Sequence, residues 1–166
     1  MRPNLLILCA VVAATWCVNA GAAPPVGELD VRMGSGGTPC FTVFQKDERR
    51  FGAPEFRSIS VSEVTPAGKA LMWAMSIPPQ RPFLVTFRLC IPYAGRLPVL
   101  PKTTALPLQP GKVYETLIEI TPPMLSSAPR AYRARFCLSA KAGGTVQLHT
   151  LSGAAFEGKG RAGCSG

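Results

Sequence analysis

Six cysteines are the residues of this chain most able to do chemistry, and their spacing points to structure. Two of them, Cys9 and Cys17, lie in an apolar N-terminal stretch. The other four are spread through the rest of the chain, at Cys40, Cys90, Cys137 and Cys164. None forms the Cys-x-x-Cys pair on which zinc sites and thioredoxin-like redox centres are built. We therefore expect no metal and no cofactor, and we interpret the four later cysteines as an even set of disulfide partners.

Four cysteines allow three disulfide connectivities. Alternation along the expected strands puts Cys90 and Cys137 on the charged faces, away from the apolar residues. The bridges are thus expected at strand ends or outside the core. Among the three arrangements we favour Cys40–Cys90, which joins early strands, and Cys137–Cys164, which clamps the tail.

Other catalytic groups are sparse. The single histidine, His149, stands beside Gln147 on the polar face of an expected strand, where a solvated imidazole is the ordinary interpretation. A Ser-His-Asp triad would need Asp30 or Asp47, the only aspartates, and no serine lies in a nucleophile-elbow motif. No motif marks paired carboxylates or a nucleotide-binding glycine loop. We predict that the protein is not an enzyme.

Residues 1–22 have the order of a secretory signal peptide. Arg2 supplies the basic start, Leu5 to Val18 is almost wholly apolar, and small residues precede a cleavage point before Ala23. The apolar run of about 14 residues is shorter than the roughly 20 that span a membrane. We expect a mature domain of residues 23–166, exported to the periplasm.

A lipid anchor on Cys17 is the disfavoured alternative. A lipoprotein signal places Leu-x-small directly before the modified cysteine, and Trp16 occupies that last place here.

The composition of the mature chain favours short strands and a basic surface. The whole chain has 17 prolines and 16 glycines, all but Pro3 and Gly21 in the mature part, and they argue against long helices. Loss of Arg2 leaves 17 basic and 9 acidic side chains, a formal charge of +8. An exported protein with dispersed arginines is a poor candidate for nucleic-acid binding. An acidic protein partner fits the charge better, with a plain solvated surface as the alternative.

Alternating apolar and polar residues predict seven to nine strands and no helix. The expected strands lie at 28–33, 40–44, 58–62, 71–77, 83–89, 112–121, 131–139 and 146–150. Phe83 to Leu89 alternates most cleanly, and Gly143-Gly144 predicts a hairpin turn. We predict an all-β fold, an antiparallel immunoglobulin-like β-sandwich braced by disulfides and ending in a Gly-rich tail. A closed barrel is the alternative.

Charged residues divide into two groups on this fold. Glu115 and Glu119 are expected opposite Arg133 and Arg135 across a hairpin, as decoration of the sheet. Two stretches, Gln45–Phe56 and Pro92–Pro110, are expected as exposed loops that contact a partner. The candidate partner-binding residues are Lys46, Arg49, Arg50, Arg57, Arg96 and Lys102.

Four segments in this order resemble a known family. They are Cys40-Phe41-Thr42-Val43, Arg88-Leu89-Cys90-Ile91-Pro92-Tyr93, Leu108-Gln109-Pro110-Gly111-Lys112-Val113-Tyr114 and Tyr132-Arg133-Ala134-Arg135-Phe136-Cys137-Leu138. Together they resemble the small exported immunity lipoproteins of the type VI secretion system, over roughly residues 28–150. The resemblance implies a compact β-sandwich without catalytic activity that neutralises an antibacterial effector in the periplasm. The chain departs from the family in lacking a lipoprotein signal at Cys17.

Two functions of different class remain after these exclusions. The first is an immunity-type binding protein whose loops cover a cognate effector, a partner expected to be acidic. The alternative is a structural or secretion-assembly domain of the cell envelope, which an exposed edge strand would favour. A small-ligand binder would need a deep apolar pocket, of which the sequence gives no sign.

Overall fold

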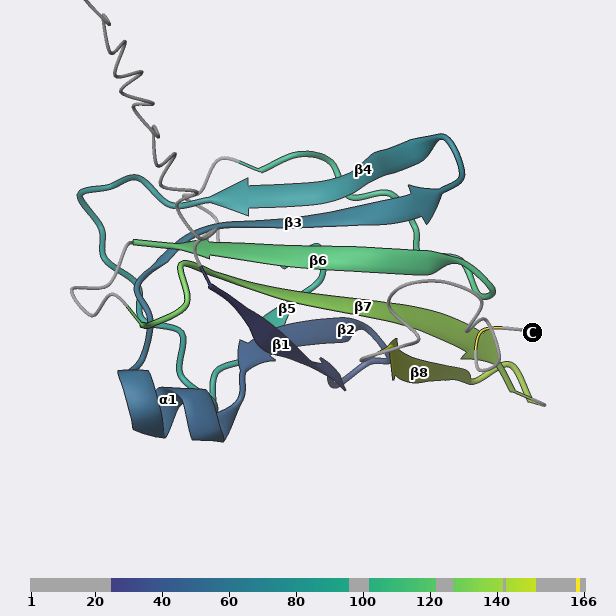
Figure 1. Cartoon of the computed structure of the whole chain (residues 1–166). Helices are drawn as coiled ribbons and strands as arrows, with labels where there is room; N and C mark the ends of the chain where they lie inside the picture. The colour runs from purple at the N-terminus through teal and green to yellow at the C-terminus, as the bar shows by residue number, and fades with distance from the viewer. Residues whose placement is uncertain (1–24, 96–101, 122–126, 142, 152–163, 165–166) are drawn as a thin grey trace, which may run out of the picture.

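The computed structural model describes residues 25–95, 102–121, 127–141, 143–151 and 164 (Figure 1). The expected signal peptide, Cys17 and Arg96 lie outside these residues. The described elements are β1 (Val26–Met33), β2 (Pro39–Val43), α1 (Gln45–Phe51), β3 (Phe56–Thr65), β4 (Gly68–Ser76), β5 (Ile91–Pro92), β6 (Val113–Ile120), β7 (Ala131–Ala140) and β8 (Val146–Leu151). The predicted all-β class is confirmed.

The strands form one sheet that curls on itself, in the order β4-β3-β6-β7-β1-β2-β5, with β8 also paired to β7. β1 belongs to both parts of the sheet, because its first residues pair with one strand and its later residues with another. Val26–Glu28 pair in parallel with β7, and Leu29–Met33 pair antiparallel with β2. The resulting layers, β4-β3-β6-β7 and β1-β2-β5, follow the immunoglobulin order of strands C′-C-F-G and A-B-E.

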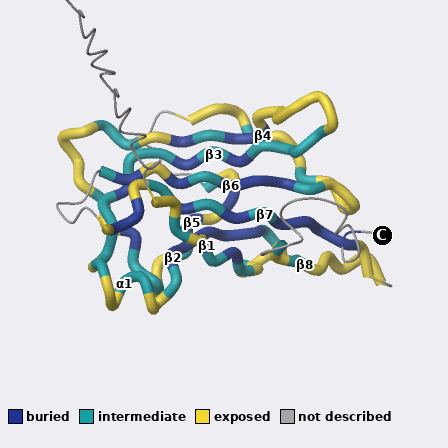
Figure 2. The backbone as a smooth tube through the Cα atoms, in the orientation of Figure 1, coloured by how far each residue is buried: buried dark blue, intermediate teal, exposed yellow. Residues whose placement is uncertain are grey.

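The core lies between these layers and consists of the inward-facing residues of the alternating strands (Figure 2). Aromatic side chains fill its centre. Phe136 packs against Phe41 with ring centres 5.8 Å apart and against Tyr114 at 5.5 Å, while Trp73 meets Tyr93 edge-on at 5.5 Å. Such contacts stabilise the fold by burying large apolar areas.

Tyr114 ties the start of β6 to the loop before it. Its hydroxyl accepts a hydrogen bond from the Gln109 amide at 2.7 Å and donates one to the Gln109 carbonyl at 3.3 Å. Gly111 turns the chain between them with a φ of 78°. This is the tyrosine corner of immunoglobulin-like domains, and it explains the Pro-Gly-Lys entry into the strand.

Both disulfide pairings favoured from the sequence are confirmed. Cys40 is bonded to Cys90, and Cys137 to Cys164. The Gly143-Gly144 turn between β7 and β8 is confirmed as well, since both glycines have positive φ. The Lys141 amide donates to the Thr145 carbonyl across that turn.

The prediction of a strand over Phe83–Leu89 is wrong beyond its first residues. Residues 83–85 are extended and bond to 54–56, with the Val85 amide donating to the Pro54 carbonyl at 2.9 Å. Thr86 to Leu89 then form a turn, closed by the Leu89 amide on the Thr86 carbonyl at 2.9 Å. Alternation wrongly predicts a strand here, because backbone groups of residues 86 and 87 bond to side chains of other elements and not to a neighbouring strand.

The prediction that the mature chain has no helix is also wrong. Residues Gln45–Phe51, expected as loop, form α1, although none of its residues is buried, as expected. Asp47 and Glu48 lie in its first turn and Arg49 and Arg50 in its last, the order that complements a helix dipole.

Candidate functional site

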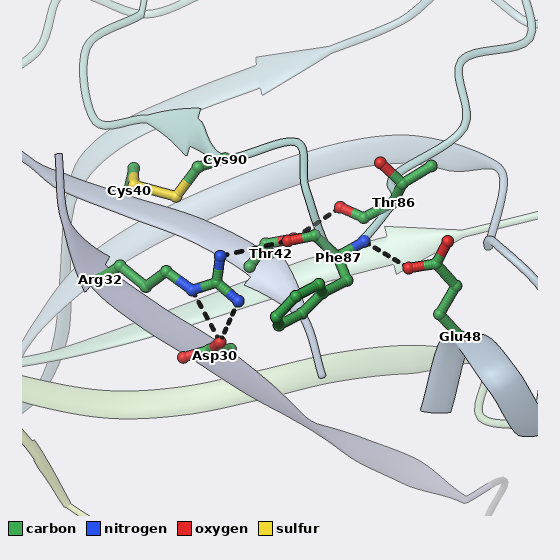
Figure 3. Close-up of polar contacts among 8 residues, drawn as sticks. All are labelled: Asp30, Arg32, Cys40, Thr42, Glu48, Thr86, Phe87 and Cys90. Atoms are coloured by element: carbon green, nitrogen blue, oxygen red, sulfur yellow. Dashed lines mark hydrogen bonds and ion pairs between the residues drawn. A yellow bond between two sulfur atoms is a disulfide. The ribbon is translucent and has the colours of Figure 1, made fainter. Parts of the chain in front are cut away.

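The turn Thr86–Leu89, called the anchored turn below, is fixed to its surroundings at both ends (Figure 3). Val85 before it is fully buried, and Cys90 after it is bonded to Cys40 on β2. The Thr42 hydroxyl donates to the Thr86 carbonyl at 2.8 Å. The turn therefore cannot move independently of β2.

Two charged side chains hold the tip of the anchored turn. The Glu48 carboxylate on α1 accepts a hydrogen bond from the Phe87 amide at 2.6 Å. From β1, the Arg32 guanidinium donates to the Phe87 carbonyl at 3.2 Å and stacks on its ring, 4.3 Å from the centre. Asp30 orients Arg32 through contacts of 2.7 and 2.9 Å. Hydrogen bonds to charged groups are the stronger kind, so the tip is firmly placed.

The side chains that the anchored turn leaves outward are Arg88 and Leu89. Both are exposed, Leu89 to 37 %. Backbone atoms of Thr86 and Phe87 bind the scaffold, while these two neighbours face solvent. A rigid scaffold presenting a few exposed side chains on a loop is the usual architecture of a recognition site.

A groove of about 430 Å³ separates the anchored turn from α1. Its lining consists of Gln45, Glu48, Arg49, Thr86, Phe87 and Arg88. Arg49 and Arg88 have no ion-pair partner within the described part of the chain, and both are exposed. Two guanidinium groups against the single Glu48 carboxylate leave this groove, the basic groove below, with positive charge.

The neighbouring cations of α1 extend this positive surface. Lys46 lies over the Phe44 ring at 5.1 Å, and Arg50 over the Phe51 ring at 5.0 Å. Both remain exposed, so the aromatic contacts restrict them without hiding their charge.

The structure brings three of the six candidate partner-binding residues together on α1, namely Lys46, Arg49 and Arg50. Arg57 stands on β3 and Lys102 faces the outer edge of β4 through its bridge to Met75. Arg96 lies outside the described residues. The sequence did not indicate Arg88 as a site residue because it was assigned to a strand face. It did not indicate Glu48 and Arg32 because their bonds to the turn are with backbone atoms of Phe87, far away in the sequence.

A second polar cluster surrounds Glu115 on the outer face of the sheet. Its carboxylate bonds to Lys69 at 2.5 Å and to Arg135 at 2.9 Å, and the residue is only 5 % exposed. Burial alone would raise the pKa of Glu115, but the bonds to the two cations outweigh it and lower that pKa. The expected pairing of Glu115 with Arg135 is confirmed. Glu119 lies opposite Ala131 and accepts a hydrogen bond from Ser58 at 2.7 Å.

The one arrangement that resembles a nucleophile with its base is Ser139 on β7 and His149 on β8. Ser139 Oγ lies 2.8 Å from His149 Nε2 on the outer face of the sheet. Within the described residues no carboxylate is bonded to the imidazole to orient it, which catalytic triads require. We interpret the pair as a cross-strand hydrogen bond.

No metal-binding group of three or more His, Cys, Asp or Glu side chains occurs among the described residues. Over the same part of the chain, no helix is long and apolar enough to cross a membrane. The two disulfides indicate an oxidising compartment outside the cytoplasm.

No family model, curated protein or solved structure matches this chain. The resemblance to type VI immunity lipoproteins therefore stays a prediction.

Proposed function

We propose that this protein is a periplasmic binding protein of immunity type, which covers the active site of an antibacterial effector. The observation that carries the proposal is the anchored turn, which presents the exposed Arg88 and Leu89 next to a groove that Arg88 shares with Arg49 of α1.

Rigidity supports tight binding because little conformational entropy is lost when the complex forms. Arg32, Thr42, Glu48 and the Cys40–Cys90 bridge hold the anchored turn before any partner arrives. An interface of this kind needs an apolar contact surrounded by polar groups, with arginine favoured among them. Leu89 and the arginines meet that requirement.

The charge of the surface selects the partner. A basic binder associates faster with an acidic surface, and the rate falls as salt is added. The partner is therefore an effector whose active-site rim is acidic.

The test is co-expression in the periplasm with the product of the adjacent gene. Wild-type protein should restore growth and co-purify with that product. Arg49→Glu with Arg88→Glu should abolish both, while the charge-matched double reversal Arg81→Glu with Lys141→Glu, at exposed residues outside the groove, should preserve both. A toxin that kills equally with and without the wild-type protein, and does not co-purify with it, would refute the immunity function.

A second candidate function is an assembly domain of the cell envelope, and the edge of β8 favours it. β8 reads Val-Gln-Leu-His-Thr-Leu, without Lys, Arg, Asp, Glu, Pro or Gly. Natural edge strands usually carry such residues to prevent pairing with other chains. No described strand pairs with the outer edge of β8, whereas residues 103 and 106 bond to the outer edge of β4. A partner strand added to β8 would use this edge.

Amide hydrogen exchange distinguishes this candidate. Protein taken from the envelope fraction should show extra protection confined to Val146–Leu151 when compared with refolded, purified protein. Identical exchange of β8 in the two samples would exclude strand addition there.

A further inference from the structure

An apolar hollow of about 190 Å³ lies at the other end of the segment that forms the anchored turn. Its lining consists of Met75, Phe83, Leu89, Cys90, Ile91, Pro92 and Gly95. None of the described residues that line it has a charged side chain. The volume is below the roughly 300 Å³ at which pockets for drug-sized ligands begin, so it suits a single large apolar side chain.

One continuous segment lines both the apolar hollow and the basic groove. Residues 86–88 line the groove and residues 89–92 the hollow. The boundary between groove and hollow falls between two exposed neighbours, because Arg88 lines the groove and Leu89 lines the hollow. Their backbone is held by the disulfide at Cys90 and by Glu48. The distance between the basic groove and the apolar hollow is therefore fixed by the fold.

From this arrangement we infer a two-part site that takes a peptide segment carrying an apolar side chain close to a carboxylate. The apolar side chain enters the hollow, and the carboxylate binds between Arg49 and Arg88. This inference rests on the proposed function, because it names the chemistry by which the acidic partner is recognised.

The chemistry of each part excludes the obvious alternatives. A carboxylate in the hollow would lose its hydration, and none of the described lining residues has a donor side chain that could replace the lost water. An apolar group in the groove would leave two guanidinium groups and Glu48 to be desolvated without compensation. Planar guanidinium groups match a carboxylate in geometry as well as in charge. Buried apolar anchors next to arginine are also where interface energy concentrates.

The site can be tested without the effector by nuclear magnetic resonance titration of the mature, oxidised protein. The probe is N-acetyl-L-phenylalanine, which has both an aromatic ring and a carboxylate. Two matched probes each lack one part: N-acetyl-L-phenylalaninamide has no carboxylate, and N-acetylglycine has no ring. Millimolar affinity is enough for a fragment of this size, so titration should run to about 20 mM.

We expect saturable shifts at residues 86–92 and at Arg49 with N-acetyl-L-phenylalanine, and roughly tenfold weaker binding of each incomplete probe. Arg88→Gln should make the acid and the amide bind alike, whereas Leu89→Ser should weaken both aromatic probes. The control Lys141→Gln, at an exposed cation that lines neither part of the site, should change the binding of neither aromatic probe. Both substituted residues are exposed, so the fold should survive, and unchanged amide shifts in the core will show that it does.

The inference is overturned if wild-type protein shows no saturable shift, if the shifts lie elsewhere, or if acid and amide bind equally well. Its failure is separable from that of the proposed function. Growth rescue that is lost in the Arg49/Arg88 reversal, without probe binding, would keep immunity and remove only the two-part site. Probe binding without rescue would keep the site and remove immunity.

Discussion

Glu115 illustrates how one residue on the outer face of a sheet becomes nearly inaccessible while remaining charged. Lys69 from β4 and Arg135 from β7 reach it from both sides, so its carboxylate exchanges water for two cations. Exposed ion pairs contribute little, but this carboxylate is buried and would be costly without partners.

Replacing Glu115 with glutamine should therefore lower the free energy of unfolding by about 1–2 kcal/mol at neutral pH. Urea unfolding measures the change, with Glu119→Gln as the matched control, because Glu119 is exposed and should alter stability by less than about 0.5 kcal/mol. Since the folded-state pKa of Glu115 is lowered, its contribution is complete above the pKa of an unfolded glutamate. The difference between wild type and variant should then shrink as the pH falls through the folded-state pKa. A difference that stays constant down to strongly acid pH would contradict this account.

Tyr114 acts through its hydroxyl. Tyr114→Phe keeps the ring contact with Phe136 but leaves the Gln109 amide without its acceptor. We expect a loss of about 1–2 kcal/mol in denaturant unfolding. An unchanged denaturation midpoint would show that the corner contributes no stability.

At the scale of elements, α1 acts as a support for the anchored turn. Removing the Glu48 carboxylate in Glu48→Ala should leave the global stability almost intact, because no residue of α1 is buried. The Phe87 amide should nevertheless exchange with solvent about 10–100 times faster, since it loses a charge-assisted bond. The control Asp47→Ala, on the same helix turn, should leave that amide unchanged. Equal exchange in wild type and Glu48→Ala would show that the turn is held by its other anchors alone.

Most of the strands could be predicted because each keeps one buried face, and alternation records that face directly. β3, β6 and β7 follow this rule, with Ile59, Ile118 and Tyr132 inward. The turn after Val85 could not be predicted. Phe87 occupies an apolar position of the alternating pattern, but its ring packs under Arg32 and not in the core. The helix α1 could not be predicted either, because a seven-residue helix without a buried face shows no helical repeat of apolar residues. The candidate site was half predictable: its cations are conspicuous, while the contacts that fix the turn join residues far apart in sequence.

Two disulfides cross-link the molecule, and the chain segments that they enclose differ in length. Cys40–Cys90 spans 50 residues and Cys137–Cys164 spans 27. In the chain-entropy model the two bridges stabilise by about 4 and about 3.5 kcal/mol. Replacing both cysteines of a bridge with alanine should lower the free energy of unfolding, and the loss should be larger for the Cys40/Cys90 variant than for the Cys137/Cys164 variant. The Cys40/Cys90 variant should in addition loosen the anchored turn, which hydrogen exchange at Phe87 and Leu89 will detect. A larger loss from the Cys137/Cys164 variant would contradict the order.

The three tyrosines of the chain report on the intact fold as a unit. Tyr93, Tyr114 and Tyr132 are all buried. Burial raises the pKa of Tyr93 and of Tyr132 to about 12, with Tyr114 and Asp47 adding to the respective shifts. Burial also raises the pKa of Tyr114, although its hydrogen bond to Gln109 opposes the shift.

Because the folded protein holds these phenol protons more tightly than the unfolded chain, stability should be complete below about pH 10 and decline as the pH rises toward about 12. Phenolate absorbance should stay low in the folded protein near pH 10 and then rise together with the loss of the circular dichroism signal. The same protein in concentrated denaturant should titrate near pH 10, as free tyrosine does. Phenolate that appears near pH 10 without unfolding would mean that at least one tyrosine is open to solvent. In that case either the corner at Tyr114 or the core contacts of the other two would have to be revised.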